Sequence, residues 1–599
     1  MNFFAKILIA DDFDALLRKH RYLICVKNCF PSLILSIRDF GLVTYRSCLS
    51  LRQQNKNIRH LKNYRISLNE KTFFYISLIL TIFVRLRFAD APFERDEGEY
   101  AYAGMMILRG QLPYVDFYNM KLPGVYCLYA LVFKLFGQSV AVIRYFLLFV
   151  NLITTFFVFK TAQNWLSRTA AWWASGLFML LSFSFHAQGW IANCEQFVNL
   201  FVAASLFFLT KRWNPAHLFL CGLMLGFATL MKQHAFHFAF FPAYLLLKQF
   251  LEERKFINSF IASMAFGLGF ALPLLATMFF FWQKGIFDAF YFYIIQYATA
   301  YSTLHAQIFD NINSFAYIMV DNAVMWLALL ATVFIAIKQR FSNNKETKTL
   351  DSGYFMGIKS ENTEGVNLCI LVGIALIAVC PGWYLRLHYF QYLFVPAALL
   401  MSFSLIHYER LFGVFAKKLK LTWFVGLSLL VTFAVQIEYI VLKSPDYVTS
   451  IMYRWGYFTE IREIGNYINS QAKENEYIGQ LTHEPELWFY TQTQAATGFL
   501  YAYPLIENHE YAPQLVEQYI KETESHHPDW FVYSDIRKDE KNSLTSEKLN
   551  VWAREYLKNY ELKGILYQKN KFNASFETNF LSVDTSRRVV FEVYKRKSI

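Results

Sequence analysis

The stretch Phe93-Glu94-Arg95-Asp96-Glu97-Gly98-Glu99-Tyr100 follows directly on the first long apolar segment of the chain, residues 72–90. That segment is long enough to cross a membrane, so the adjacent carboxylates Asp96 and Glu97 are expected at its outer end. A charged side chain at the centre of a bilayer costs about 2.5–3.5 kcal/mol, so acids beside a span require a polar cavity or a partner. This stretch is therefore the first place to look for a functional site.

Composition extends this interpretation to the whole chain. Of the 599 residues 55% are hydrophobic and only 17% are charged, whereas about a quarter of a soluble domain is charged. The pattern predicts an all-α polytopic membrane protein with about eleven membrane-spanning helices. A shorter apolar segment, 122–137, carries Lys134 and is expected to lie at the interface or to re-enter. The predicted spans are 72–90, 140–160, 169–186, 195–210, 215–231, 233–248, 258–282, 315–337, 366–383, 388–407 and 421–442.

The distribution of the net charge of +13 gives the orientation. Basic residues concentrate in the N-terminal 71 residues and in alternate short connections, such as Lys211-Arg212 and Arg254-Lys255. Cytoplasmic loops of membrane proteins carry such an excess of Lys and Arg, so the N-terminus is expected in the cytoplasm. The same distribution argues for contact with membrane lipids and against a nucleic-acid partner.

Three parts follow from this orientation. Residues 1–71 are a basic cytoplasmic extension, and residues 72–443 are a membrane domain whose first outer loop is 91–139. Residues 444–599 are mixed and charged, so they are expected to form a small extracytoplasmic α/β domain. Its predicted strands include 477–479, 530–533 and 589–593, and its predicted helices include 458–472 and 513–522.

Polar residues gather on the predicted outer side. Besides Asp96 and Glu97, the outer connections hold Asn119 and Lys121, then the stretches 186–195, 232–234 and 386–389. Polar residues scattered by chance would not all fall on one face of the membrane. A cavity that opens outward explains their placement.

The first outer loop also resembles a known family. Its motif runs Arg95-Asp96-Glu97-Gly98-Glu99-Tyr100 and continues through Asp116, Asn119 and Lys121-Leu122-Pro123-Gly124. It is similar to the first outer loop of the polyprenyl-phosphate-dependent GT-C glycosyltransferases of the dolichyl-phosphate-mannose-protein mannosyltransferase-like group (family 39 type). The lipid A aminoarabinose transferases are more distant relatives. The resemblance implies a GT-C membrane domain with an outward active site, in the plasma membrane or bacterial inner membrane.

The resemblance also implies roles for the acids of the loop. Asp96 is expected to activate the acceptor, with Glu97 beside it for acceptor or sugar hydroxyls. A sugar hydroxyl is a weak nucleophile, so a carboxylate that accepts its proton as the lipid phosphate leaves the anomeric carbon suits the reaction. The implied activity transfers a hexose or pentose from a polyprenyl-phosphate-linked donor, with inversion, to a glycan, lipid or protein acceptor.

Further residues carry over from the same resemblance. Relatives place a Lys-Pro-Pro segment at the donor phosphate; here Lys121-Leu122-Pro123 stands there, with one proline replaced. Met120 occupies the position of an acid in the aminoarabinose transferases, so only Asp116 or Asn119 could substitute for it. The expected phosphate-binding residues are Lys121, Arg386 and His388, joined by Lys232, which interrupts a tight apolar turn between two spans and could neutralise a phosphate. The expected substrate-binding residues are Tyr100, Asp116, Asn119, Asn193 and Glu195.

Two other function classes and one cofactor question stay open at this point. A transporter or flippase of a lipid-linked saccharide would show matching halves with broken helices, and no such duplication is visible. A glycan polymerase or ligase that uses undecaprenyl-diphosphate carriers could share the topology. A divalent metal could lie between Asp96, Glu97 and Glu195, but no ligand spacing demands one.

Overall fold

The computed structural model describes residues 69–211, 214–254, 256–303, 313–321, 364–408, 421–453, 456–536, 544–570, 573–579 and 588–598, with a few isolated residues between 326 and 359. The predicted N-terminal extension 1–71 therefore lies almost wholly outside the described residues. Most of the predicted span 315–337 does so too.

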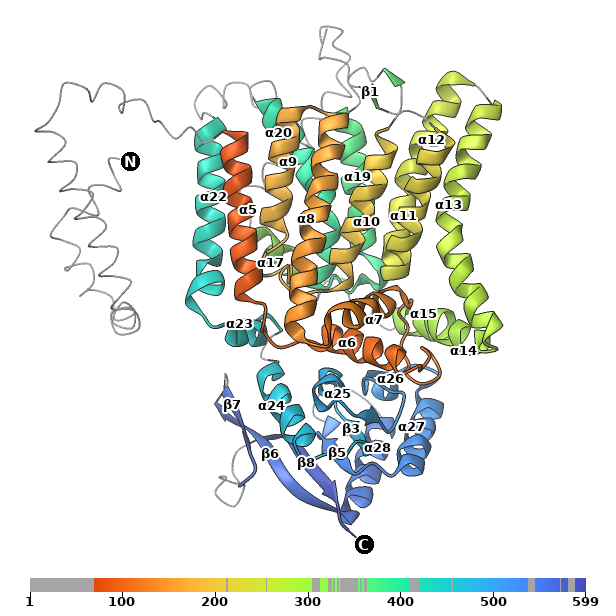
Figure 1. Ribbon diagram of the computed structural model, residues 1–599, viewed down its shortest axis with the longest axis vertical. Helices are drawn as coiled ribbons and strands as arrows, with labels where there is room; N and C mark the ends of the chain where they lie inside the picture. The colour runs from red at the N-terminus through yellow and green to blue at the C-terminus, as the bar shows by residue number, and fades with distance from the viewer. Residues whose placement is uncertain are drawn as a thin grey trace, which may run out of the picture. The chain divides into compact units, whose positions relative to one another are not determined.

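A bundle of helices forms the larger part of the described chain, and these helices run side by side in Figure 1. Each predicted apolar segment overlaps a helix, although 315–337 does so only through α17 (Asn313–Asp321). Four helical stretches are long and apolar enough to cross a membrane: Val140–Trp165, Phe256–Gln283, Leu387–Ile406 and Val425–Leu442. The number of complete spans stays a prediction. The bundle helices are α5 (Glu70–Arg87), α8 (Val140–Trp165), α9 (Arg168–Leu181), α10 (Cys194–Leu209), α11 (Pro215–Met231), α12 (Phe240–Glu253), α13 (Phe256–Gln283), α19 (Glu364–Val379), α20 (Phe394–Ile406) and α22 (Leu421–Ile437).

Short polar residues set where several of these helices begin. Asn69, Ser139, Ser167 and Asn214 each accept a hydrogen bond from a backbone N–H of the first turn of the helix that follows. Such N-caps satisfy amides that have no partner within the helix. The boundaries of α5, α8, α9 and α11 thus follow from local sequence.

The first outer loop forms two further helices, α6 (Arg95–Leu108) and α7 (Gly124–Phe136). They pack on each other and lie across one end of the bundle in Figure 1. The short apolar segment 122–137 thus becomes α7. Three short helical pieces lie at the same end: α14 (Phe287–Tyr291), η4 (Phe292–Tyr297) and α15 (Ala298–Thr303).

The C-terminal residues form a mixed sheet flanked by helices. The strand order is β4-β3-β5-β8-β6-β7. Strand β3 (Tyr477–Leu481) pairs parallel with β4 (Gln494–Ala495) and β5 (Trp530–Tyr533), whereas β8 (Val589–Arg596) is antiparallel to β5 and to β6 (Tyr560–Asn570). Strand β7 (Asn573–Glu577) closes the order beside β6. The helices are α23 (Pro445–Met452), α24 (Phe458–Asn469), α25 (Glu486–Thr491), α26 (Tyr503–Ile506), α27 (Ala512–His526) and α28 (Leu544–Tyr556).

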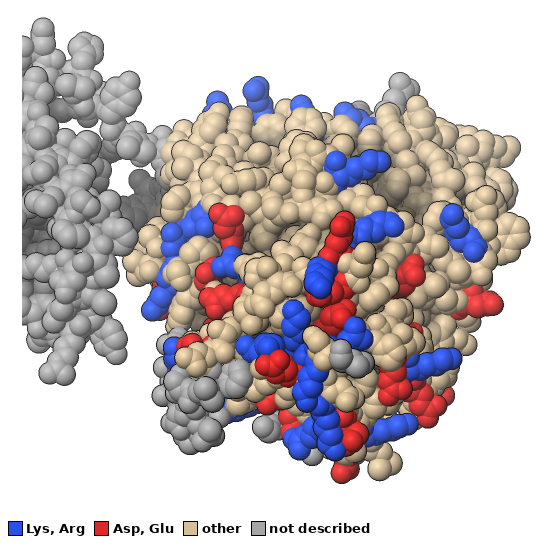
Figure 2. All heavy atoms as spheres, turned by 60° about the horizontal axis from the view of Figure 1, so that its bottom comes forward, with Lys and Arg blue, Asp and Glu red and all other residues tan. Residues whose placement is uncertain are grey.

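The helical bundle and the C-terminal region differ in how many charged side chains they expose. Figure 2 shows Lys, Arg, Asp and Glu crowded over the C-terminal elements, whereas the flank of the bundle is mostly free of them. Exposed side chains on α13 are large and apolar, among them Phe260, Leu268 and Leu275. Such a surface is expected of a helix that faces lipid.

Candidate active site

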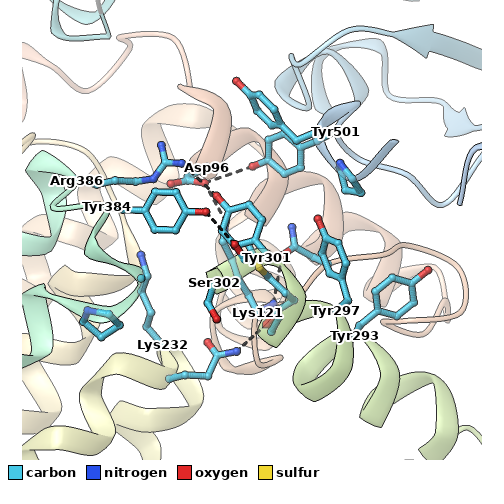
Figure 3. A pocket seen from close by; sticks show the side chains of 18 of the residues that line it. Asp96, Lys121, Lys232, Tyr293, Tyr297, Tyr301, Ser302, Tyr384, Arg386 and Tyr501 are labelled. Atoms are coloured by element: carbon cyan, nitrogen blue, oxygen red, sulfur yellow. Dashed lines mark hydrogen bonds and ion pairs between the residues drawn. The ribbon is translucent and has the colours of Figure 1, made fainter. Parts of the chain in front are cut away.

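A cavity of about 430 Å³ opens where the end of the bundle meets the C-terminal elements (Figure 3). Five parts of the chain line it: the start of α6, the loop before α7, the residues after α11, the segment 293–302, and the stretch 381–389. The C-terminal region adds Tyr453, Phe499, Tyr501, Tyr503 and Pro504. The cavity thus collects polar residues from positions up to about 400 residues apart.

Local sequence explains how Asp96 comes to face this cavity. Glu94 is the N-cap of α6, and its side chain accepts the backbone N–H of Glu97 at 3.0 Å. Asp96 therefore falls in the first helical turn, where the helix dipole favours a carboxylate. Successive residues of a helix point about 100° apart, and Asp96 lines the cavity whereas Glu97 does not.

Asp96 is held by a cation. Lys121 Nζ lies 2.9 Å from Asp96 Oδ1 and 2.6 Å from Glu99 Oε2. Burial alone would raise the pKa of Asp96, but the charges of Lys121, His388 and Lys232 hold that pKa well below its usual value. The Asp96 carboxyl is therefore ionised at neutral pH.

Lys121 stays charged because two carboxylates lie beside its ammonium. Burial alone would lower the pKa of Lys121, but Asp96 and Glu99 raise it well above the usual value. The Lys121 ammonium also lies 4.7 Å from the centre of the Tyr100 ring. Tyr100 is fully buried beneath it, so this tyrosine supports Lys121 rather than lining the cavity.

Glu97 points away from the cavity. It is fully buried and bonded to Arg144 of α8, and its Oε1 accepts the backbone N–H of Ala192 at 2.5 Å. Burial raises the pKa of Glu97, and Arg144 opposes that rise. This position differs from the one expected from the motif: Glu97 joins α6 to α8 and to the connection before α10.

Glu195 also lies behind the cavity wall. It is fully buried in the first turn of α10, where its Oε1 lies 2.5 Å from Lys232 Nζ. Lys232 itself lines the cavity, and its ammonium lies 4.4 Å from the centre of the Tyr389 ring. Glu195 thus holds Lys232 in place. Asn193, the residue before α10, is buried too and does not reach the cavity.

A second side of the cavity carries Arg386 and His388. Arg386 Nη2 donates to Tyr301 Oη at 3.2 Å, and the guanidinium lies 5.1 Å from the centre of the Tyr384 ring. His388 Nε2 lies 4.0 Å from Asp96 Oδ2 and 3.9 Å from Glu195 Oε1. Lys121, Lys232 and Arg386, together with Arg95, which pairs with Glu484, therefore place four cations on one cavity, which suits an anionic ligand.

The structure brings together about half of the residues expected from the sequence. Asp116 is exposed and accepts the backbone N–H of Leu112 at 2.7 Å, so it shapes its own loop. Asn119 lines the cavity, and its Oδ1 accepts the backbone N–H of Lys121 at 3.2 Å. The cavity is lined by Asp96, Asn119, Lys121, Lys232, Arg386 and His388, but not by Glu97, Tyr100, Asp116, Asn193 or Glu195.

Several residues of the site escaped the sequence-based prediction. Glu99 lies one helical turn after Asp96 and binds Lys121, so its spacing was a usable signal. It is fully buried and also accepts Tyr126 Oη at 2.5 Å. Tyr501, Tyr301 and Tyr384 carried no such signal, because nothing in the sequence distinguishes them from the other tyrosines.

The carboxylates considered for a divalent metal have other partners. Asp96 pairs with Lys121, Glu97 with Arg144, and Glu195 with Lys232. Across the part of the chain that the structure describes, no group of three or more His, Cys, Asp or Glu residues is placed to hold a metal ion.

Comparisons with known proteins agree with this architecture. Residues 121–282 match the protein family described as dolichyl-phosphate-mannose-protein mannosyltransferase. No curated protein sequence matches the chain significantly. ArnT from Cupriavidus metallidurans bound to undecaprenyl phosphate is similar in structure, with 13% identity and a TM-score of 0.51 over 87% of this chain and 97% of that chain. This similarity shows that the two chains share a fold.

Two more solved structures resemble the chain. ArnT from the same organism in the apo state has 14% identity and a TM-score of 0.49, over 87% of this chain and 97% of that chain. The archaeal oligosaccharyltransferase AglB from Archaeoglobus fulgidus, in complex with an inhibitory peptide and a dolichol-phosphate, has 12% identity and a TM-score of 0.46. That match covers 87% of this chain and 75% of that chain.

Proposed function

We propose that this chain is an integral-membrane GT-C glycosyltransferase that transfers a sugar from a polyprenyl-phosphate donor to an acceptor on the outer face of the membrane. One observation carries the proposal: the ionised carboxylate of Asp96 and the cations Lys121, Lys232 and Arg386 share a single cavity at one end of a membrane bundle. An anionic lipid phosphate and a proton acceptor are what this transfer requires.

The cations provide the donor site. A guanidinium presents a planar fork of N–H groups that matches phosphate oxygens, whereas an ammonium acts as a compact point charge. Arg386 and Lys232 therefore suit the phosphate of the donor. The match to the mannosyltransferase family and the undecaprenyl phosphate bound to ArnT both support a polyprenyl phosphate as the lipid.

Asp96 provides the base in this proposal. The acceptor hydroxyl oxygen attacks the anomeric carbon, the bond from that carbon to the phosphate oxygen breaks, and the lipid phosphate leaves with the bonding electrons. Asp96 takes the hydroxyl proton as the new glycosidic bond forms. A positioned base typically contributes about 10²–10⁴-fold to a rate.

Lys121 links the binding of the donor phosphate to the basicity of Asp96. Its ammonium is shared between Asp96 and Glu99. A donor phosphate in the same cavity attracts the ammonium away from Asp96, while Glu99 keeps hold of it. The loss of its cation partner raises the pKa of Asp96 toward the range in which a carboxylate is a better base.

Glu97 and Glu195 take supporting roles in this account. Glu97 is bonded to Arg144, and Glu195 is bonded to Lys232. Neither carboxylate lines the cavity, so neither is proposed to touch a substrate in this state. Glu97 fixes the start of α6, and Glu195 fixes the phosphate-binding Lys232.

The orientation and localisation belong to the same proposal. We place the N-terminus in the cytoplasm and residues 444–599 outside it, in a plasma membrane or bacterial inner membrane. The connections α8–α9, α10–α11 and α12–α13 support this, because they lie at the end of the bundle away from the C-terminal elements in Figure 1 and carry Arg168, Lys211 and Arg254. The cavity then faces the side on which a lipid-linked sugar meets an extracytoplasmic acceptor.

The experiment uses the purified full-length protein and a panel of undecaprenyl-phosphate-linked sugars, each radiolabelled in the sugar. Acceptors are supplied as separate glycan, peptide and lipid extracts. We expect one donor to be consumed, with label appearing in one extract. Two outcomes contradict the proposal: label that only crosses a reconstituted bilayer indicates a transporter, and transfer from an undecaprenyl-diphosphate oligosaccharide alone indicates a polymerase or ligase.

A further inference from the structure

Tyr501 brings the C-terminal region into contact with the proposed base. Its Oη donates to Glu99 Oε2 at 2.6 Å and lies 3.3 Å from Asp96 Oδ1. These are the two carboxylates that Lys121 Nζ contacts from the other side. Figure 3 shows Tyr501 reaching toward Asp96 from across the cavity. Lys121 of the membrane part and Tyr501 of the C-terminal part thus each lie against both carboxylates, and Tyr126 donates to Glu99 as well.

The loop that carries Tyr501 is tied to the first outer loop. The backbone N–H of Tyr118 donates to the carbonyl of Gly498 at 2.7 Å. Glu522 of α27 accepts Tyr118 Oη at 2.6 Å and Thr497 Oγ1 at 2.7 Å. One carboxylate therefore binds both loops, so the position of Tyr501 is set by more than its own hydrogen bonds.

An ion pair next to Asp96 also joins the first outer loop to the C-terminal region. Arg95 makes two hydrogen bonds to Glu484, at 3.0 and 2.6 Å, which is the bidentate geometry of a strong pair. The Arg95 side chain is 29% exposed and that of Glu484 only 4%. The residue before Asp96 is thus fixed to the same C-terminal part that supplies Tyr501.

We propose, resting on the proposed function, that Tyr501 is a positioning residue for Asp96, and that the C-terminal domain completes the active site through it. The single phenolic proton goes to Glu99, the closer carboxylate, and the Tyr501 oxygen and ring close the space on that side of Asp96. When Lys121 turns to the donor phosphate, Glu99 stays bonded to Tyr126 and Tyr501, and Tyr501 remains as the neighbour that lies against Asp96 as well. The membrane domain alone then has the phosphate-binding cations but a loosely held base.

The test compares Tyr501→Phe with wild type in the full-length protein, using the undecaprenyl-phosphate sugar that the wild type turns over. The change removes one hydroxyl and keeps the ring, so packing is preserved. We expect kcat to fall about 10- to 100-fold, the usual effect of one hydrogen bond to a charged group. Affinity for undecaprenyl phosphate alone should stay within about threefold, because the cations are untouched.

Tyr594→Phe is the matched control, since Tyr594 Oη donates at 3.0 Å to Glu592 and does not line the cavity. It should leave kcat unchanged. A wild-type kcat in Tyr501→Phe overturns the inference, and so does an equal loss of kcat and of undecaprenyl phosphate affinity, which would show a general disturbance of the cavity. Failure of the proposed function is seen separately, because the wild type itself would then release no sugar.

Discussion

At the scale of single residues, the side chains of the neighbours Asp96 and Glu97 have different surroundings. Asp96 faces a cavity with cations, and Glu97 is buried against Arg144. The motif predicted that the pair matters, but sequence alone assigned both acids to substrate. The helical rotation between neighbours decides which one faces the cavity, and the N-cap Glu94 fixes where that rotation starts.

Some contacts of the site cannot be predicted from a local motif. Lys121 was predicted as a phosphate ligand from the family resemblance and Lys232 from its place in a turn between two spans, and both roles stay predictions. Their carboxylate partners Glu99 and Glu195 depend on packing between separate parts of the chain. Tyr501 lies about 400 residues from Asp96 in the sequence. No local pattern predicts such a contact, because it arises from the docking of two regions.

Two neighbouring glutamates at this docking site lead to a prediction about pH. Burial alone would raise the pKa of Glu484, but the charge of Arg95 holds that pKa below its usual value near 4.5. The pKa of Glu486 lies well above 4.5, because burial and the charge of Glu484 both raise it. Ionised Glu484 therefore adds stability above about pH 4.5, and that gain is lost as the pH falls toward its lowered pKa. The Glu486 contribution is full below about pH 4.5 and is lost as the pH rises toward its raised pKa.

We expect opposite effects from Glu484→Gln and Glu486→Gln. The first breaks a mostly buried ion pair and should destabilise by about 3–5 kcal/mol at neutral pH, with less effect in acid. The second removes a buried acid that resists ionisation and should stabilise at neutral pH. Unfolding midpoints of the full-length protein between about pH 4 and pH 8 measure both. A shift of the same sign for the two variants at neutral pH would refute the assignment.

At the scale of elements, α6 is the helix on which the site depends. It supplies Asp96 and Glu99 to the cavity region, packs on α7, and contacts α25 of the C-terminal region. That last contact depends on Gly98, because a Cβ there would lie 2.3 Å from the Cβ of Glu486. The glycine of the Asp-Glu-Gly-Glu motif is thus explained by close helix packing rather than by chemistry.

Gly98→Ala should therefore separate α6 from α25. We expect sugar release to fall by at least about tenfold, together with faster proteolysis of the C-terminal region, since both helices must move for a Cβ to fit. Gly267→Ala is the matched control: Gly267 lies inside α13, and a Cβ there meets no atom within 4 Å. Wild-type activity and protease resistance in Gly98→Ala would show that the close contact is not needed.

At the scale of the whole molecule, most helices and half of the strands of the six-stranded C-terminal sheet followed from the sequence. Apolar segments of membrane length predicted the bundle helices, because the bilayer fixes their length and the capping residues fix their starts. Strands β3, β5 and β8 were predicted from runs of β-branched and aromatic residues, whereas β6 and β7 were not. Strand β6 carries polar residues such as Lys563, Gln568 and Lys569, and lies near the edge of the sheet.

The orientation of the molecule is testable by cysteine labelling. The labelling starts from a protein in which all eight native cysteines are replaced by serine. In it, Ser525→Cys lies in the C-terminal region and Glu252→Cys near the end of α12, both exposed. We expect a membrane-impermeant maleimide to label Ser525→Cys in intact cells, and Glu252→Cys only after permeabilisation, because basic connections stay in the cytoplasm. The reverse pattern would place the cavity on the cytoplasmic side and contradict the proposed topology.

The central claim is that Asp96 accepts the proton of the acceptor in a cavity whose cations hold the lipid phosphate. The most direct measurement compares wild type, Asp96→Asn and the control Asp116→Asn for sugar transfer from the active donor, with undecaprenyl phosphate binding measured on the same preparations. We expect Asp96→Asn to lose about 10²–10⁴-fold in kcat and to bind undecaprenyl phosphate at least as tightly as the wild type does. Asp116→Asn should match the wild type. Wild-type transfer by Asp96→Asn would contradict the account.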